Sequence, residues 1–414
     1  MATISLGVIV KNDERLLDSF LSLHEPFVDE IIVVDTGSRD KTKEIAKKHG
    51  KVKLFEISWE DDFSKARNAC KDHASKEWVL MLDPDEQLKK EDLEKIKQYM
   101  DSNKADAIAL QLPQQNQSPI SVPQNSLVKA FKNNKQFMYQ YRVYEIIEPS
   151  ILEHKKNIMI VPVSLQFHGE KSRQQEEARQ EYYKKLLELE IRELPQDPKP
   201  WFELGMAYYT HKEFEKALSY FEKAVSLKSA VKIWDFLGHT YYQIKEDEKA
   251  FDAYRHAILL SPNPAFAFRN LGIFFLKENK EALALRAFGE SLKHDPIDIA
   301  TLNNAAFLFL RHNEQEKAEQ LFEQIKEICK EKGVDLPLKT LTNWGMSYLQ
   351  RKEYGKAEEM FKKALVHEDV VAYGNLAELY LKTGKKDKAR EIIKKAEAKK
   401  LQSKQLTKLK EELS

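Results

Sequence analysis

The chain has 414 residues, of which 42% are hydrophobic and 32% charged, with 67 Lys and Arg against 66 Asp and Glu. This length predicts two or three domains with hydrophobic cores, and the net charge of +1 excludes the basic footprint of a nucleic-acid-binding protein. The two cysteines, Cys70 and Cys329, exclude a disulfide framework and fit a reducing compartment. Because no secretory signal and no apolar run of roughly 20 residues is present, we expect a soluble, cytoplasmic protein without a membrane span.

Short apolar strands alternate with helices in the N-terminal part of the chain. Apolar, β-branched runs predict buried strands, and apolar residues at helical spacing predict the helices between them. This alternation predicts a mostly parallel sheet covered on both faces, with Cys70 as a small core residue on a helix. The strands are expected at residues 4–10, 31–34, 52–57 and 78–82, and the helices include residues 15–23 and 41–49, the second ended by Gly50.

Polar side chains follow three of these strands at the point where each strand ends. Asn12 follows the first strand, Asp35 the second, and the pair Asp83 and Asp85 the last. Ligands of such sheets bind beyond the carboxyl ends of the strands, and two carboxylates one residue apart suit a hard divalent cation. An acidic pair of this kind is also common in ordinary turns. The coincidence of three clusters at one edge favours a binding site.

Four sequence blocks occur in order through this part of the chain: Ile9–Glu14, Asp29–Thr42, Trp59–Asn68 and Trp78–Glu86. Together they resemble the family 2 glycosyltransferases of the GT-A fold, a Rossmann-like α/β fold. The closest resemblance is to the sublancin S-glycosyltransferase group of bacterial protein and peptide glycosyltransferases, in which this domain is joined to tetratricopeptide repeats. The resemblance covers about residues 4–170 for catalysis. It implies a UDP-sugar donor and a divalent cation, Mn²⁺ or Mg²⁺, and leaves the sugar and the acceptor open.

The resemblance implies a metal site at Asp83 and Asp85. Asp85 would bind the cation and so take part in catalysis, with Asp83 supporting it directly or through the ribose and metal-bound water. The cation would stabilise UDP as it leaves. His168, in a late His-Gly element, is a third candidate ligand, since imidazole suits Mn²⁺ beside carboxylates; a lone His after a strand is otherwise a surface or core residue. Glu86 is expected to cap or orient the following helix.

The first strand-to-helix loop and the second strand would form the donor site. By resemblance, Val10, Asn12 and Glu14 would contact uracil and ribose, although Asn12 could equally be a helix N-cap. Asp35 resembles the acid that reads the nucleobase or the ribose. Arg67 lies in an Ala-Arg-Asn block and is expected to pair with a donor phosphate or with the carboxylates of the metal site. The structural alternative is a salt bridge from Arg67 to Asp62 or Asp35.

The acceptor side is expected near residues 127–148. Arg142-Val-Tyr-Glu145 falls where many family members carry Arg-Val-His-Glu, which makes Glu145 the candidate general base. It would take the acceptor proton as the nucleophile attacks the anomeric carbon in line with leaving UDP, giving inversion. Tyr144 replaces the family His and could orient Glu145, bind the sugar, or signal a changed acceptor or lost activity. Glu148 is the alternative base.

The second half of the chain repeats at intervals of about 34 residues, the length of a tetratricopeptide helix pair. A pair of apolar and small residues recurs in step with a later Ala, and we expect six units, the fourth with a second helix extended over residues 314–332. The organisation predicted is a GT-A domain at 1–170, a helical connector at 171–199, an all-α repeat solenoid at 200–397 and a capping helix at 398–414.

Three functions are compatible with this pattern. The first is a metal-dependent, inverting transfer of sugar from UDP to a protein or peptide held by the repeats, with the Gln- and Asn-rich segment 113–123 as a mobile loop over the site. The second is a non-catalytic repeat scaffold or nucleotide-sugar sensor, which only Tyr144 favours. The third is a glycan- or lipid-directed transferase. The repeats could also form a homodimer interface.

Overall fold

The computed structural model describes residues 2–111, 126–168, 172–367 and 369–413. The chain divides into two compact units, residues 1–244 and 245–414. The segment 113–123, for which the sequence suggested a mobile loop, lies outside the described residues, as does Gly169. Within the described ranges, no helix is long and apolar enough to cross a membrane.

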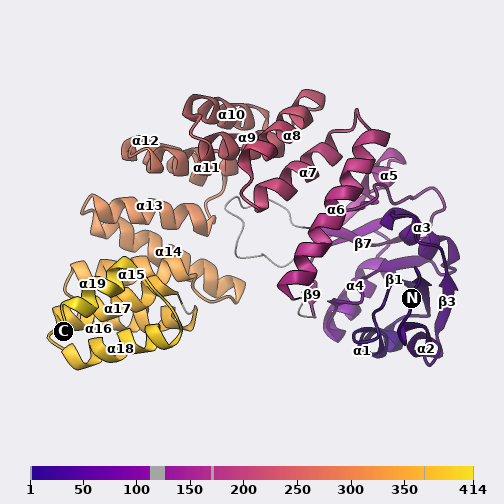
Figure 1. Cartoon of the computed structure of the whole chain (residues 1–414), viewed down its shortest axis with the longest axis horizontal. Helices are drawn as coiled ribbons and strands as arrows, with labels where there is room; N and C mark the ends of the chain where they lie inside the picture. Colours follow the sequence, from indigo (N-terminus) through magenta and orange to yellow (C-terminus); the bar gives the residue numbers. More distant parts are fainter. Residues whose placement is uncertain (1, 112–125, 169–171, 368, 414) are drawn as a thin grey trace. The chain divides into compact units, whose positions relative to one another are not determined.

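A seven-stranded sheet with the order β3-β2-β1-β4-β7-β6-β8 forms the centre of the α/β domain, which is the first part of the N-terminal unit (Figure 1). Strands β1 to β4 run parallel, and β8 runs parallel to β6, whereas β7 runs antiparallel to both of its neighbours. The predicted mostly parallel sheet is therefore confirmed. The strands are β1 (Ile4–Val10), β2 (Glu30–Asp35), β3 (Val52–Glu56), β4 (Trp78–Met81), β6 (Ala107–Gln111), β7 (Ser126–Lys132) and β8 (Ile158–Ser164).

Core residues lie on both faces of this sheet, as the sequence predicted. Successive side chains of β2 alternate between two apolar clusters, so that Val33 packs with Phe20 and Val34 packs with Cys70. Cys70 is fully buried, which confirms it as a core residue. The helices are α1 (Leu17–His24), η1 (Glu25–Phe27), α2 (Thr42–Ala46), α3 (Phe63–His73), α4 (Lys90–Asp101) and α5 (Glu148–Glu153).

A second, two-stranded sheet lies beside the acidic turn. Its strands are β5 (Glu86–Gln87) and β9 (Gln166–Phe167), which pair antiparallel. A residue expected to cap the following helix, Glu86, therefore belongs to a strand, and α4 begins four residues later with Lys89 at its N-cap. This pairing brings the end of the α/β domain back to the turn that carries Asp83 and Asp85.

The connector is one long helix, α6 (Arg173–Glu193), which begins with a capping box. The Ser172 side chain accepts from the Gln175 backbone N–H, and the Gln175 side chain accepts from the Ser172 N–H in return. The first repeat follows directly. The remaining helices of this unit are α7 (Pro198–Thr210), α8 (Phe214–Leu227) and α9 (Val231–Gln243).

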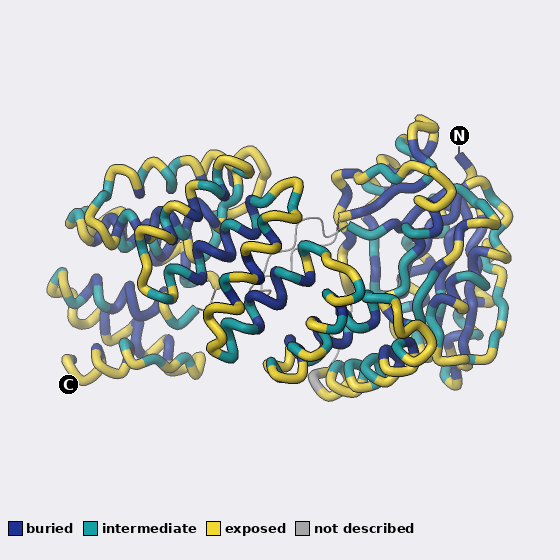
Figure 2. The backbone as a smooth tube through the Cα atoms, turned by 90° about the horizontal axis from the view of Figure 1, so that it is seen from above, coloured by how far each residue is buried: buried dark blue, intermediate teal, exposed yellow. Residues whose placement is uncertain are grey.

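The C-terminal unit consists of helices packed in sequence (Figure 1). Each buries one side, and Figure 2 shows the alternation of buried and exposed turns along them. The fourth repeat has an 18-residue second helix, four residues longer than those of 14 residues before it. The helices are α10 (Asp247–Leu260), α11 (Ala265–Lys277), α12 (Glu281–His294), α13 (Ile299–Arg311), α14 (Gln315–Lys332), α15 (Leu338–Gln350), α16 (Tyr354–Ala364), η2 (Leu365–His367), α17 (Val370–Lys382), α18 (Lys386–Ala398) and α19 (Lys404–Glu411).

Candidate functional site

The carboxyl ends of β1 and β2 lie side by side, with Val10 directly opposite Asp35. Asp35 is fully buried, and its Oδ1 accepts from the backbone N–H groups of Gly37 and Ser38, both at 2.9 Å. This turn needs Gly37, whose φ is +107°. The second oxygen, Oδ2, is buried and has no hydrogen-bond partner among the described residues. A buried carboxylate oxygen left open at a strand end is available to a ligand.

Asn12 and Glu14 join the loop after β1 to the loop after β2. The Asn12 Oδ1 accepts from the Arg39 N–H at 2.8 Å, and the Asn12 N–H donates to the Ser38 Oγ at 2.9 Å. The Glu14 Oε2 accepts from the Lys41 N–H at 3.1 Å. Asn12 is not the N-cap of α1, a position held by another residue. Both side chains are exposed and lie beside the Asp35 turn.

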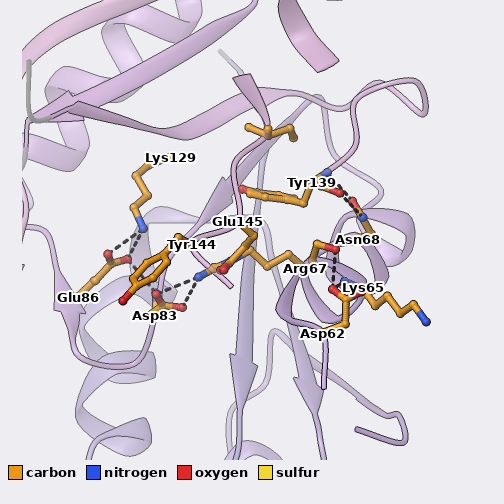
Figure 3. Close-up of polar contacts among 12 residues, drawn as sticks. Asp62, Lys65, Arg67, Asn68, Asp83, Glu86, Lys129, Tyr139, Tyr144 and Glu145 are labelled. Carbon is orange, nitrogen blue, oxygen red and sulfur yellow. Dashed lines mark hydrogen bonds and ion pairs between the residues drawn. The ribbon is translucent and has the colours of Figure 1, made fainter. Parts of the chain in front are cut away.

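The acidic turn after β4 is locked by the residue that follows it. Asp83 and Glu86 exchange hydrogen bonds, since the Glu86 N–H donates to the Asp83 carbonyl at 2.9 Å and the Asp83 N–H donates to the Glu86 Oε2 at 3.0 Å. The buried Lys129 ammonium donates to both Glu86 oxygens at 2.7 Å. Figure 3 shows this pair beside Asp83. Glu86 and Lys129 thus fix the shape of the turn.

Arg67 joins the acidic turn to the acceptor-side segment (Figure 3). Its Nη2 donates to both oxygens of Asp83 at 3.0 Å, and its Nε donates to Glu145 Oε1 at 2.5 Å. Burial alone would lower the pKa of Arg67, but the two carboxylates raise it well above its usual value. Neither Asp62 nor Asp35 takes part in this contact. Asp62 instead caps α3 by accepting from the Lys65 N–H.

Two features of Arg67 matter for a ligand. Its side chain is only 9% exposed, so its charge acts in a poorly solvated place. Its Nη1 is buried and has no hydrogen-bond partner among the described residues. A guanidinium with one unused nitrogen is suited to a phosphate or carboxylate oxygen.

Glu145 lies on a closed loop, residues 140–146, which we call the Glu145 loop. Gln140 and Ile146 exchange two backbone hydrogen bonds at its base, at 2.9 and 3.2 Å. The Glu145 side chain is 10% exposed and is held by Arg67. Glu148, the alternative base, has both oxygens occupied by backbone N–H groups, those of Val128 and Ile147. Of the two candidate bases, Glu148 is thus the one committed to the backbone.

Tyr144 belongs to this loop and directly precedes Glu145. The residue is 38% exposed, and its ring meets that of Tyr183 of α6 edge to face at 5.6 Å between centroids. Burial among charged neighbours raises the pKa of Tyr144 to about 12, so its hydroxyl is protonated at neutral pH and can donate a hydrogen bond. The replacement of the family His therefore leaves a neutral donor in place of a titrating group.

The three candidate metal ligands are only partly assembled. The His168 N–H donates to the Asp85 carbonyl oxygen at 2.8 Å, so these two residues are neighbours, while Asp83 is held by Arg67. His168 is exposed. In the described part of the chain, no group of three or more His, Cys, Asp or Glu side chains is arranged to hold a metal ion.

Asp13 is a residue that the sequence reasoning missed. Burial, followed by the fields of Asp85, Asp40 and Asp83, raises the pKa of Asp13 to about 6, against the N–H of Lys11, which lowers it. The carboxylates of Asp13, Asp83 and Asp85 therefore lie close enough to influence one another, and carboxylate oxygens are donors that a hard divalent cation takes. To this extent the residues present fit a cation. The sequence did contain a signal for Asp13, because this residue lies in the Lys-Asn-Asp-Glu block that follows the first strand.

Residues 5–161 match the sequence model of the family described as Glycosyl transferase family 2. Residues 198–229, 231–264 and 348–413 each match a tetratricopeptide repeat. The N-terminal part of the chain thus carries a family 2 glycosyltransferase domain, and tetratricopeptide repeats follow it.

Two kinds of relative match part of this chain. A TPR repeat-containing protein of Synechococcus elongatus is 36% identical over 152 residues, 37% of each chain. The glycosyltransferase SunS of Bacillus subtilis, also found in Bacillus phage SPbeta, is 36% identical over 95 residues, 23% of this chain and 22% of SunS. The matches therefore span about a third and about a fifth of these relatives.

Among solved structures, the Cut9 and Hcn1 assembly of the APC/C matches 56% of this chain and 46% of its own chain, with 19% identity and a TM-score of 0.48. YrrB, described as a TPR protein with an unusual peptide-binding site, matches 45% of this chain and 95% of its own chain, with 21% identity and a TM-score of 0.34. At these TM-scores no argument about function rests on either likeness.

Proposed function

We propose that this protein is an inverting glycosyltransferase that moves a sugar from a UDP-sugar donor to a protein or peptide side chain. The observation that carries the proposal is the Arg67 contact, which joins Asp83 of the acidic turn to Glu145 of the acceptor-side loop. The Nε and Nη2 groups of one guanidinium thereby hold an acceptor-side and a donor-side carboxylate near each other. This supports a transferase, since the groups that assist the leaving and the attacking atoms must lie close to the same carbon.

The donor side of the proposal rests on Asp35 and its neighbours. The open Oδ2 of Asp35 is suited to an N–H of the nucleobase or a hydroxyl of the ribose. Val10 lies opposite Asp35, and Asn12 and Glu14 hold the two loops that would enclose the nucleoside. The open Nη1 of Arg67 would take a diphosphate oxygen.

In the proposed reaction, Glu145 accepts the proton of the acceptor nucleophile as this attacks the anomeric carbon from the face opposite UDP. Its carboxylate is oriented by Arg67, whose charge also favours the developing charge of the diphosphate. A divalent cation held by Asp85 and His168, with Asp83 or Asp13 nearby, would supply further stabilisation of that charge. The neutral Tyr144 hydroxyl would donate to the sugar or to the acceptor.

The repeats are proposed to hold the acceptor. Stacked helix pairs present long curved surfaces that suit extended polypeptides. This favours a protein or peptide acceptor over a glycan or lipid carrier. The proposed site of action is the cytoplasm, where nucleotide sugars are made. The scaffold alternative is disfavoured by the intact contact among Arg67, Asp83 and Glu145, because a domain retained only as a relic does not need it.

Release of UDP from a panel of UDP-sugars with Mn²⁺ tests this proposal. The wild-type chain should hydrolyse one donor slowly, and Asp85→Ala should lose that activity while it keeps its fold. Asp387→Ala, which removes a carboxylate that is 99% exposed in α18, is the matched control and should behave as wild type. With an acceptor in hand, Glu145→Gln should lower transfer about 100-fold or more and keep donor binding. Unchanged turnover in Asp85→Ala would reject the metal assignment.

A further inference from the structure

The Glu145 loop is held from outside the α/β domain by the end of α6. The Arg142 N–H donates to Glu190 Oε1 at 2.6 Å, and the Arg142 guanidinium donates to both oxygens of Glu193, at 2.9 and 2.5 Å. Glu190 is 2% exposed, so its contact with the loop is shielded from water. Two acids of the connector thus fix the residue three positions before Glu145.

The first repeat helix, α7, holds the same loop at two further points. The Lys199 ammonium donates to the Tyr144 carbonyl oxygen at 2.9 Å and lies 4.2 Å from the centre of the Tyr141 ring. The Tyr141 hydroxyl donates to Asp197 Oδ2 at 2.9 Å. The Tyr144 carbonyl belongs to the peptide bond that leads into Glu145. Lys199 therefore acts on the backbone of the candidate base itself.

The loop needs this support because its backbone is strained. Tyr141 and Tyr144 have φ values of +78° and +53°, in the left-handed region that bulky residues avoid. Such conformations persist only where the surroundings over-determine them, and they gather at functional sites. The contacts that hold this loop in its conformation are made by Arg67 and by residues of α6 and α7.

We infer that Lys199, together with Glu190 and Glu193, positions Glu145, so that the connector and the first tetratricopeptide helix are part of the catalytic apparatus as well as of the repeat array. This inference rests on the proposed function, in which Glu145 of this loop is the general base. Lys199 is a positioning residue: it reaches Glu145 through the Tyr144 peptide and touches neither donor nor acceptor. It follows that the first repeat has a role separate from holding the acceptor.

The chain offers a matched control for Lys199. Lys232 occupies the same place in the next repeat, as the second residue of α9, and its ammonium lies 4.8 Å from the centre of the Phe202 ring. Both lysines therefore contact an aromatic ring at the start of a repeat helix. Lys199 alone of the two donates to the Glu145 loop.

The test compares full-length Lys199→Met, Lys199→Arg and Lys232→Met in two measurements. In donor turnover, Lys199→Met should lose about 10- to 100-fold in kcat with the donor KM within about twofold, the pattern of a misplaced catalytic group. Lys199→Arg should recover most of the loss, and Lys232→Met should match wild type. Equal kcat in Lys199→Met and wild type would overturn the inference.

The second measurement is independent of activity. Hydrogen–deuterium exchange of peptides that cover residues 140–146 should be faster in Lys199→Met than in wild type or Lys232→Met, because the Arg142 and Ile146 N–H groups lose a fixed loop. Unchanged exchange would overturn the inference whatever the enzyme does. A wild-type chain that turns over no donor would instead count against the proposed function, and the exchange result would still decide the role of Lys199.

Discussion

Glu190 combines almost complete burial with a carboxylate oxygen that finds no hydrogen-bond partner in the described part of the chain. Burial raises the pKa of Glu190 from 4.5 to about 7, although the N–H of Arg142 and the charge of Lys199 oppose this. The folded chain therefore binds more protons than the unfolded chain between these two values. Since stability falls with pH wherever the folded state holds the extra proton, this residue destabilises the fold as the pH rises from about 4.5 to 7.

Glu190→Gln should remove that dependence. The amide oxygen can still accept from the Arg142 N–H, and the amide carries no charge to desolvate. Urea unfolding at about pH 5 and pH 8 should show the variant gaining on the wild type by roughly 1–2 kcal/mol as the pH rises. The control is Glu193→Gln, whose carboxylate is 55% exposed and whose pKa is lowered by Arg142, so it should gain nothing. A constant difference between Glu190→Gln and wild type would contradict this account.

Some features of the candidate site could be predicted from the sequence and others could not. Asp35 and Asp83 could be placed at one edge of the sheet because parallel strands end there. The contact between Arg67 and Glu145, 78 residues apart, could not be foreseen, because it depends on β7 lying next to β4 and on the path of the chain after it. Asp62, the expected alternative partner, is used by its own helix as a cap.

At the scale of elements, a contact between a glycine and a phenylalanine recurs within the repeats. In three repeats a glycine of the first helix faces a phenylalanine of the second, so closely that an added Cβ would lie 2.4 to 2.6 Å from a ring carbon. The two helices of a pair can approach closely only because the glycine has no side chain. The pairs are Gly205 with Phe221, Gly272 with Phe288, and Gly345 with Phe361.

Gly272→Ala should therefore destabilise the C-terminal unit by about 1–3 kcal/mol, the usual cost of overpacking. Gly289→Ala is the matched control, because Gly289 lies in α12 of the same repeat and an added Cβ there would meet nothing within 4 Å. That variant should be neutral or more stable by up to about 1 kcal/mol, since Ala favours helix. Thermal unfolding of both variants measures the difference, and equal melting temperatures would count against this packing role.

Elements were easier to predict from the sequence than their ends or partners. Residues 41–49 were expected to form one helix, but α2 covers only Thr42–Ala46 and the chain continues as turns. The repeats were recognisable because small residues recur at matching positions in every unit, as packing of the helix pairs requires. The antiparallel pairing of β7 with β4 and β6 could not be predicted from the sequence, because a strand buried on both faces has the same apolar pattern in either direction.

At the scale of the whole molecule, the groups proposed for catalysis and for holding Glu145 all lie within residues 1–244. A chain that ends at Ile244 should keep donor hydrolysis within a few-fold of the full chain and lose transfer to a protein acceptor. A chain that ends at residue 170 should lose donor hydrolysis as well, because Glu190, Glu193 and Lys199 are absent. UDP release is the measurement, with circular dichroism to show that each chain is folded. Equal hydrolysis by both short chains would contradict the prediction.

The bond from Lys199 to the Tyr144 carbonyl also bears on how such a chain can change its acceptor over evolutionary time. New repeats can be acquired by recombination, which is easiest at a boundary where few contacts are cut. A crossover at the end of the α/β domain would exchange Lys199 along with the array and release the Glu145 loop. A crossover beyond the first repeat would leave that loop with its own supports. We therefore expect the first repeat to be inherited together with the α/β domain. The later repeats can change in sequence as the acceptor changes.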